Sequence, residues 1–259
     1  MLHKLSDLHG FTVSATTDEI GSIDDFYFDD RTWDIRYVIV DTGPWIFGRR
    51  VLLVPSAIQS INWTDRVLSI QLTKEQIENS PPIDAEKPVS RQNEIDLHEY
   101  YGWSGYWYSA PGLVTPAGPL GSAYGVPIPP VDEAIANSPI ESESEFESGD
   151  PYLRSAKEVQ GYNIQATDDD IGHVEDFFAD EEELNIRYML VDTRNWLPGR
   201  NVLVGTKWIN RIDWTKRDLI VDITREQVED SPEYNPVETL SRGYEENLHK
   251  YYHLPPYWY

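Results

Sequence analysis

Two stretches of the chain, 151 residues apart, decide its fold. They are Trp33-Asp34-Ile35-Arg36-Tyr37-Val38-Ile39-Val40-Asp41-Thr42 and Leu184-Asn185-Ile186-Arg187-Tyr188-Met189-Leu190-Val191-Asp192-Thr193. Each begins with alternating polar and apolar residues and then becomes apolar on both faces, at Val38-Ile39-Val40 in the first stretch. A short run that is apolar on both faces predicts a strand in the interior of a sheet.

The similarity extends well beyond these ten residues. A shift of 151 residues aligns residues 10–81 with 161–232 without a gap, and 32 of the 72 positions are identical. The match resumes at Ser90-Arg91, Leu97-His98 and Tyr106-Trp107-Tyr108, which fall on Ser241-Arg242, Leu248-His249 and Tyr257-Trp258-Tyr259. Self-similarity of this extent indicates a tandem duplication.

A stretch between the two copies has no counterpart. Residues 110–150 hold 7 of the 18 prolines and no Lys or Arg, and they include an alternating Glu/Ser run. This composition is typical of a linker. We therefore predict repeat 1 at residues 1–109, a linker at 110–150 and repeat 2 at 151–259.

Within repeat 1 the apolar residues mostly recur every second position. Six strands are predicted, at 11–15, 22–28, 33–41, 50–54, 57–63 and 67–72. Two helices follow, Lys74 to Asn79 after Thr73 and about Arg91 to Tyr101 after Ser90, because Thr and Ser are good N-caps. Short strands with helix only at the end predict a mainly β fold, a small six-stranded antiparallel barrel or sandwich.

The hairpin that turns at residues 29–32 permits a prediction of register. If Phe28 pairs with Trp33, Asp25 lies across from Arg36, and by the same rule Asp176 lies across from Arg187. Opposite charges in such cross-strand pairs contribute about 0.2–1 kcal/mol. We interpret the two pairs as structural determinants of register, with a buried functional pair as the alternative.

Composition excludes several classes of protein. The chain has 21 Lys+Arg and 45 Asp+Glu, a net charge of −24, and no cysteine. Thiol catalysis, disulfides and Cys-ligated metals are therefore excluded, and so much negative charge disfavours nucleic acid and anionic lipid as partners. With no apolar run of about 20 residues and no signal-like N-terminus, we expect a cytoplasmic protein without membrane insertion.

One family resembles this pattern. The segment Glu19-Ile20-Gly21-Ser22-Ile23-Asp24-Asp25-Phe26, followed by the stretch from Trp33 to Thr42, resembles the PRC-barrel family, as do its copies in repeat 2. The family is named for the reaction-centre H subunit of photosynthesis, whose membrane-spanning helix has no counterpart here. The resemblance implies two six-stranded β-barrels that act as adaptor or assembly modules, without a family-wide catalytic site.

Candidate metal and catalytic sites are weak. The acidic turns at 168–170 and 180–183 lack EF-hand spacing, so a solvated turn is the better interpretation. Glu94 with His98 and Glu245 with His249 have the i, i+4 spacing of metal ligands, but two ligands do not close a site. Hydrolase, Walker and dinucleotide-binding motifs are missing from the sequence. We expect no catalytic residues, no metal and no cofactor.

Aromatic and arginine residues are the best candidates for an interaction surface. They are Trp45, Arg49, Trp196, Arg200, Trp107 and Trp258, because amphipathic aromatics are favoured where one side is packed and the other is wet. Alternatively, each aromatic tail folds back over its own repeat. We predict a non-catalytic protein-interaction or scaffold module, packed as a pseudo-dimer, with an unknown protein partner and possible homo-oligomerisation. The alternative is a small-ligand or metal sensor that uses the cleft between the barrels.

Overall fold

The computed structural model describes residues 1–46, 48–81, 89–106, 152–193, 196–197, 200–236 and 239–258. They belong to two compact units. The first unit comprises residues 1–77 and 152–259 and holds the β-sheets of both repeats. The second comprises residues 78–151 and holds helix α3. The predicted linker at 110–150 lies outside the described residues.

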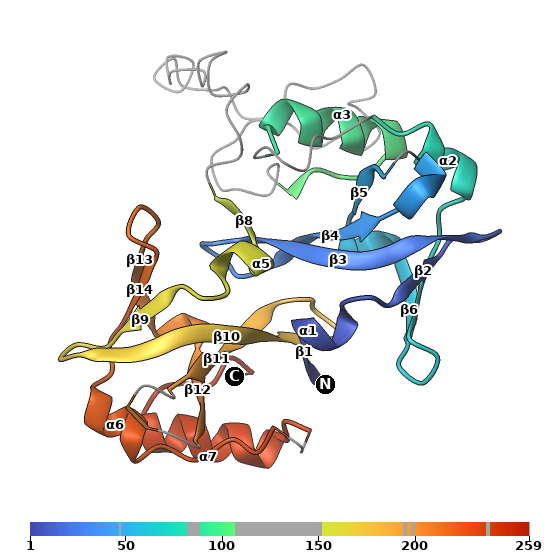
Figure 1. The fold of residues 1–259 in the computed structure, drawn as a ribbon. Coiled ribbons are helices and arrows are strands. Elements are labelled where there is room, and N and C mark those ends of the chain that lie inside the picture. The colour runs from blue at the N-terminus through green and yellow to red at the C-terminus, as the bar shows by residue number, and fades with distance from the viewer. Residues whose placement is uncertain are drawn as a thin grey trace, which may run out of the picture. The chain divides into compact units, whose positions relative to one another are not determined.

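Repeat 1 forms one sheet with the strand order β5-β4-β3-β2-β7-β6 (Figure 1). Its strands are β2 (Thr12–Ser14), β3 (Glu19–Asp29), β4 (Ile35–Asp41), β5 (Arg50–Leu53), β6 (Ile58–Asn62) and β7 (Val67–Ile70). All six overlap the predicted strands. The apolar strand β4 has a neighbour on each side, as its sequence predicts.

Repeat 2 has the same arrangement, β12-β11-β10-β9-β14-β13. These strands are β9 (Asn163–Gln165), β10 (Asp170–Asp180), β11 (Ile186–Asp192), β12 (Asn201–Gly205), β13 (Ile209–Asp213) and β14 (Asp218–Val221). The two halves of the duplication therefore have one topology.

The predicted mainly β fold is confirmed, but the structure differs from the predicted antiparallel barrel in two respects. β2 pairs with β7 in parallel, and β9 pairs with β14 in parallel, so both sheets are mixed. Among the described residues, the hydrogen-bonded path of each sheet runs from one end strand to another and does not close into a barrel. Four antiparallel pairs of consecutive strands, β2–β3, β3–β4, β4–β5 and β6–β7, form before the sheet is completed by β7 beside β2.

Each sheet also has a seventh strand, which comes from the other repeat. β1 (Leu2–Lys4) pairs with β10, and β8 (Leu153–Ser155) pairs with β3. Each of these strands continues into one helical turn, α1 (Leu5–Leu8) or α5 (Ala156–Val159). We call Leu2–Leu8 donor segment 1 and Leu153–Val159 donor segment 2.

The remaining helices follow the sheets. Helix α2 (Lys74–Glu78) and helix α3 (Arg91–Tyr101) lie at the predicted positions, and the Ser90 hydroxyl caps α3 at the amide of Asn93. Their counterparts in repeat 2 are α6 (Arg225–Glu229) and α7 (Arg242–Tyr252). None of the helices in the described ranges is long and apolar enough to cross a membrane.

One glycine in each repeat is required by close packing of the backbone. Gly21 has φ +151°, and a Cβ built on it would lie 2.1 Å from the carbonyl oxygen of Asp41. Gly172 stands in the same relation to Asp192, at 2.0 Å. These glycines let β3 and β10 cross close to the following strand.

Candidate functional site

Strand β3 is long enough to pair with two partners along one edge. Its first part, around Glu19 to Ser22, pairs with β2 of the same repeat. Its last part, Tyr27–Asp29, pairs with Ser155, Arg154 and Leu153 of donor segment 2. In repeat 2 the corresponding residues Phe178–Asp180 of β10 pair with Lys4, His3 and Leu2. We call Tyr27–Asp29 acceptor edge 1 and Phe178–Asp180 acceptor edge 2; Figure 1 shows both donor strands beside their acceptors.

Apolar side chains fix both donor segments. Leu2, Leu5 and Leu8 are buried in donor segment 1, and Ala156 and Val159 are buried in donor segment 2. Spacings of three residues place such side chains on one face of a strand-to-helix turn. Complete burial of one leucine contributes about 1.5–3 kcal/mol, so the three buried leucines stabilise the attachment of donor segment 1.

The buried carboxylate of Asp25 accepts hydrogen bonds from donor segment 2. Asp25 accepts the Ser155 hydroxyl at Oδ2 (2.5 Å), and its Oδ1 accepts the backbone amides of Phe26 (2.7 Å) and Lys157 (3.1 Å). The Lys157 ammonium also pairs with Asp24. Three donors compensate a carboxylate that is only 6% exposed.

Asp176 does the same for donor segment 1, with one difference. It accepts the Ser6 hydroxyl at Oδ2, and Oδ1 accepts the amides of Phe177 (2.8 Å) and Ser6 (3.4 Å). Ser6 aligns with Lys157, and Lys4 aligns with Ser155. The backbone donor is therefore equivalent in the two repeats, whereas the hydroxyl comes from positions two residues apart.

Burial shifts the titration of this region. Desolvation raises the pKa of Asp25 and that of Asp176 above the ordinary value, although the Ser155 or Ser6 hydroxyl and backbone amides act in the opposite direction. His9, which ends α1 and stacks on Phe26 at 5.9 Å, has a lowered pKa because it is desolvated and lies near Lys157. Protons thus bind these carboxylates more readily than in water.

Basic and acidic side chains flank each donor strand in a matched way. Arg154 pairs with Asp30 at 3.2 Å and lies over the ring of Trp214 at 4.2 Å. At the aligned positions, His3 lies 3.3 Å from Glu181 and stacks on Trp63 at 3.9 Å. Each donor residue is held between an acid of the other repeat and a tryptophan of its own.

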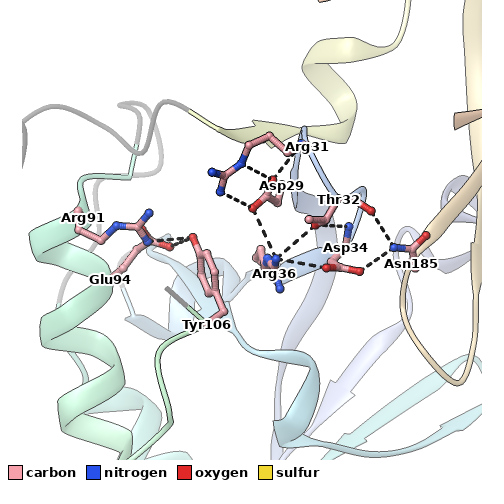
Figure 2. Close-up of polar contacts among 9 residues, drawn as sticks. All are labelled: Asp29, Arg31, Thr32, Asp34, Arg36, Arg91, Glu94, Tyr106 and Asn185. Atoms are coloured by element: carbon pink, nitrogen blue, oxygen red, sulfur yellow. Dashed lines mark hydrogen bonds and ion pairs between the residues drawn. The ribbon is translucent and has the colours of Figure 1, made fainter. Parts of the chain in front are cut away.

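The two hairpin tips also meet. Asp34 and Asn185 form a β-bridge, and the Asn185 amide donates to Asp34 Oδ1 (2.6 Å) and to the Thr32 carbonyl (3.0 Å), as Figure 2 shows. Behind them Trp33 stacks on Phe28 at 5.0 Å and lies 6.3 Å from Phe177 of repeat 2. The interface between the repeats therefore combines an apolar centre with paired polar groups.

The predicted pairing of Asp25 with Arg36 is wrong, as is that of Asp176 with Arg187. Asp25 lies opposite Ile39, and Asp176 lies opposite Leu190. The turn is wider than expected, because Phe28 pairs with Ile35, and register shifts on β3 displace the ladder further. β-Bulges of this kind add a residue to one strand and re-aim its side chains.

The two arginines have other partners near the turns. Arg36 Nη2 lies 3.5 Å from Asp29 and 3.2 Å from Asp34, and it donates to the Thr32 hydroxyl at 3.3 Å (Figure 2). Arg187 pairs with Glu183. Asp29 also accepts Arg31, and although burial acts against it, these donors and cations leave the pKa of Asp29 lowered.

A second buried polar cluster joins α7 to the sheet of repeat 2. The Tyr188 hydroxyl lies 2.8 Å from His249 Nε2 and 3.2 Å from Glu245 Oε1. His249 Nδ1 faces the Leu254 carbonyl at 3.3 Å, which can only accept, so Nδ1 carries the proton. Desolvation lowers the pKa of His249 and raises that of Glu245, which favours a neutral imidazole, and the one Tyr188 hydroxyl proton is shared between two acceptors, His249 Nε2 and Glu245 Oε1.

The aromatic tail of repeat 2 packs on its own helix. The Tyr257 hydroxyl donates to Glu245 at 2.8 Å, Arg242 lies 3.2 Å from the same carboxylate, and Trp258 packs edge-on against His249 at 5.2 Å. The second unit repeats the motif within itself. Tyr106 donates to Glu94 at 2.7 Å, and Arg91 donates to Glu94 at 2.8 Å (Figure 2). These contacts favour a tail that folds back on its own repeat.

The other predicted interaction residues have structural contacts. Trp196 donates to the Ile171 carbonyl at 3.0 Å and carries Arg225 over its ring. Arg49 donates to the Ile77 carbonyl near the end of α2 (2.9 Å), and Arg200 donates to the backbone carbonyls of Glu229, the last residue of α6, and Ser231. Trp107 and the side chain of Trp45 lie outside the described residues.

Reasoning from the sequence missed the donor segments. Their signal lies in the repeat itself, because Leu2, Leu5 and Leu8 align with Leu153, Ala156 and Val159. Both runs precede Gly10 or Gly161, in a stretch where few residues are identical between the two copies. Among the residues described, no group of three or more His, Asp or Glu side chains could hold a metal ion.

These observations define a class: a mainly β protein of two like repeats that complete each other's sheets. The PRC-barrel domain family model matches residues 2–77 and 153–228, more than half of the chain. The chain therefore belongs to the PRC-barrel family, with two such domains in tandem. A search of curated proteins finds no match to it.

Proposed function

We propose that this chain is a non-catalytic protein-interaction or assembly module whose binding surfaces are acceptor edges 1 and 2. One observation carries the proposal: each edge holds, as an added strand, a segment that belongs to a different repeat. Strand addition is a common mode of peptide recognition, in which main-chain hydrogen bonds give affinity and side-chain contacts give specificity.

The polar contacts support recognition as the role of this surface. The Ser155 and Ser6 hydroxyls each occupy one oxygen of a buried carboxylate, and Arg154 reaches Asp30 at the end of β3. Such groups are costly to bury unless the matching partner is present. They therefore select a segment that carries a hydroxyl and a base at the correct spacing.

The contacts of the second buried cluster support the absence of catalysis. Both oxygens of Glu245 are paired, with Tyr257 and with Arg242, and both nitrogens of His249 have partners. A general base must reach a proton of its substrate. A saturated, buried network is better suited to attaching α7 to the sheet.

Hydrogen–deuterium exchange on the full chain tests the proposal. Ala156→Asp places a carboxylate at a position that is 1% exposed and close to Asp25, and it should release donor segment 2. Peptides that cover 152–160 and 26–31 should then exchange at least tenfold faster, while those from β11 and β12 keep their protection. Glu158→Gln, at an exposed position on the same turn, is the matched control. Unchanged protection in Ala156→Asp would refute acceptor edge 1 as a binding surface.

A further inference from the structure

Both donor segments are attached to their repeats in a way that permits exchange. Each helical turn ends in an extended residue, His9 or Gln160, and is followed by Gly10 (φ +74°) or Gly161 (φ +85°). A Cβ on either glycine would meet nothing within 4 Å, so the space around these two positions is open. Changes in φ and ψ at one or two such positions redirect the segment without disturbing the sheet.

The contacts between a donor segment and its acceptor edge do not require that the two repeats belong to the same chain. The hydrogen bonds to Asp25, the pairing with Tyr27–Asp29 and the ion pair with Asp30 would be identical if donor segment 2 came from a different molecule. Exchange of an identical element between protomers is a low-cost route to dimers.

The covalent link between the repeats decides whether an acceptor edge is filled by a donor segment of its own chain or by one of a second molecule. Residues 78–152 separate the family-model matches of the two repeats, and because both repeats belong to one chain, the pairing of a donor segment with its acceptor edge is intramolecular, with an effective concentration above that of micromolar free chains. The single chain at micromolar concentration therefore fills its own edges. A partner's segment gains access to an edge when the chain's own donor is released, and a donor whose own acceptor is blocked becomes free to enter the edge of a partner.

We infer that acceptor edge 1 is a binding site for a short peptide segment with a base, a hydroxyl and a small apolar residue in sequence, and that a second copy of this chain supplies it. Arg154, Ser155 and Ala156 are the residues that meet Asp30, Asp25 and the buried face in the segment that now fills the edge. This inference rests on the proposed function, because it takes the edge to be a recognition surface. It adds the class of ligand and the partner.

Complementation between two full-length variants tests it. Ala156→Asp disables donor segment 2, and Asp25→Lys disables acceptor edge 1, because it removes the acceptor of Ser155 and places a cation beside Lys157. Each variant alone should be a monomer of about 29.9 kDa at 10 µM. Their equimolar mixture should contain a 1:1 heterodimer, of mass 2 × 29.9 = 59.8 kDa, by native mass spectrometry. The pair Glu158→Gln and Asp25→Lys is the control and should give no heterodimer, because the Glu158→Gln chain fills its own edge.

A peptide measurement keeps the test independent of the Asp25→Lys variant. A labelled peptide of residues 152–161 should bind the full-length Ala156→Asp chain saturably in fluorescence anisotropy, and a Ser155→Ala peptide should bind at least tenfold more weakly. If circular dichroism shows that Ala156→Asp has lost its sheet, Ser155→Ala replaces it as the donor variant.

The outcomes separate the two ideas. If Ala156→Asp accelerates deuterium exchange at the edge but the mixture stays monomeric and the peptide does not bind, the partner assigned here is wrong while the proposed function stands. If Ala156→Asp leaves exchange unchanged, both fail. Heterodimer together with specific peptide binding supports both.

Discussion

The two serines that donate to the buried carboxylates provide the sharpest test of how the repeats recognise each other. Ser155→Ala removes a hydroxyl that donates to Asp25 at 2.5 Å and also accepts the Glu158 amide at 3.0 Å as the N-cap of α5. Ser6→Ala removes only the hydroxyl bond to Asp176, because Ser6 lies within α1 and no side chain caps that turn. The two substitutions therefore differ by one capping interaction.

The expected magnitudes follow from these contacts. A hydrogen bond to a charged group contributes about 1.5–3 kcal/mol, and loss of a serine N-cap costs about 1 kcal/mol. Ser6→Ala should lower the free energy of unfolding by about 1.5 kcal/mol, at the low end because Ser6 is exposed. Ser155→Ala should lower it by about 1 kcal/mol more, owing to the cap.

Urea unfolding followed by tryptophan fluorescence measures both. With a slope of about 3 kcal/mol/M, the extra 1 kcal/mol corresponds to about 0.3 M in the midpoint. Ser60→Ala, at an exposed position on β6, is the control and should change stability by less than about 0.5 kcal/mol. Equal losses for Ser6→Ala and Ser155→Ala, or losses no larger than that of the control, would refute the contact assignment.

Two further predictions concern pH and backbone packing. Burial raises the folded-state pKa of Asp25 above the unfolded value of 3.8. The folded state therefore binds the proton first, and this group adds to the stability of the protein as the pH falls through the raised pKa. Asp25→Asn should remove that gain in thermal melts between pH 7 and 4, and a pH profile identical to that of the unsubstituted chain would contradict the prediction. Gly21→Ala should be far more destabilising than Gly10→Ala, because only the Cβ at position 21 would collide with a backbone carbonyl. Gly10→Ala should cost about 1–2 kcal/mol, owing to its positive φ. Similar chemical-denaturation midpoints for the two variants would contradict the close approach at Gly21.

Local pattern predicted most of the fold. The apolar stretch at Val38–Val40, the caps at Thr73 and Ser90 and the six strands of each repeat depend on residues close in sequence, where periodicity and capping act directly. Because the repeat is duplicated, each of these patterns occurs twice in the sequence. Sequence reasoning therefore placed nearly every strand and helix of the two sheets.

The parts that were missed depend on pairing between distant segments. Leu2–Lys4 and Leu153–Ser155 are three-residue strands, too short for a periodic signal, and their partners lie in the other repeat. The predicted register of the hairpin was wrong for a different reason. A cross-strand sum assumes an uninterrupted ladder, and the shifts at Ile23/Asp25 and Tyr27/Phe28 break it.

The same bulge explains why a carboxylate is buried at the contact between repeats. On β3 Ile23 is buried and Asp24 is less buried, and after the register shift between Ile23 and Asp25 the next two residues, Asp25 and Phe26, are both buried. β10 repeats the pattern at Asp176 and Phe177. The bulge thus turns an acid toward the incoming donor segment.

The acid is identical in the two repeats, and the donor that satisfies it is not. Asp25 takes its hydroxyl from the last residue of β8 and Asp176 from the second residue of α1, while the backbone amide that each accepts comes from aligned positions. The main-chain contact fixes where the segment lies, and either neighbouring side-chain position can then deliver a hydroxyl to the same oxygen. A partner segment for these edges is therefore recognised by the position of its hydroxyl in space, and an alignment that demands serine at one fixed position would miss one of the two donor segments of this chain.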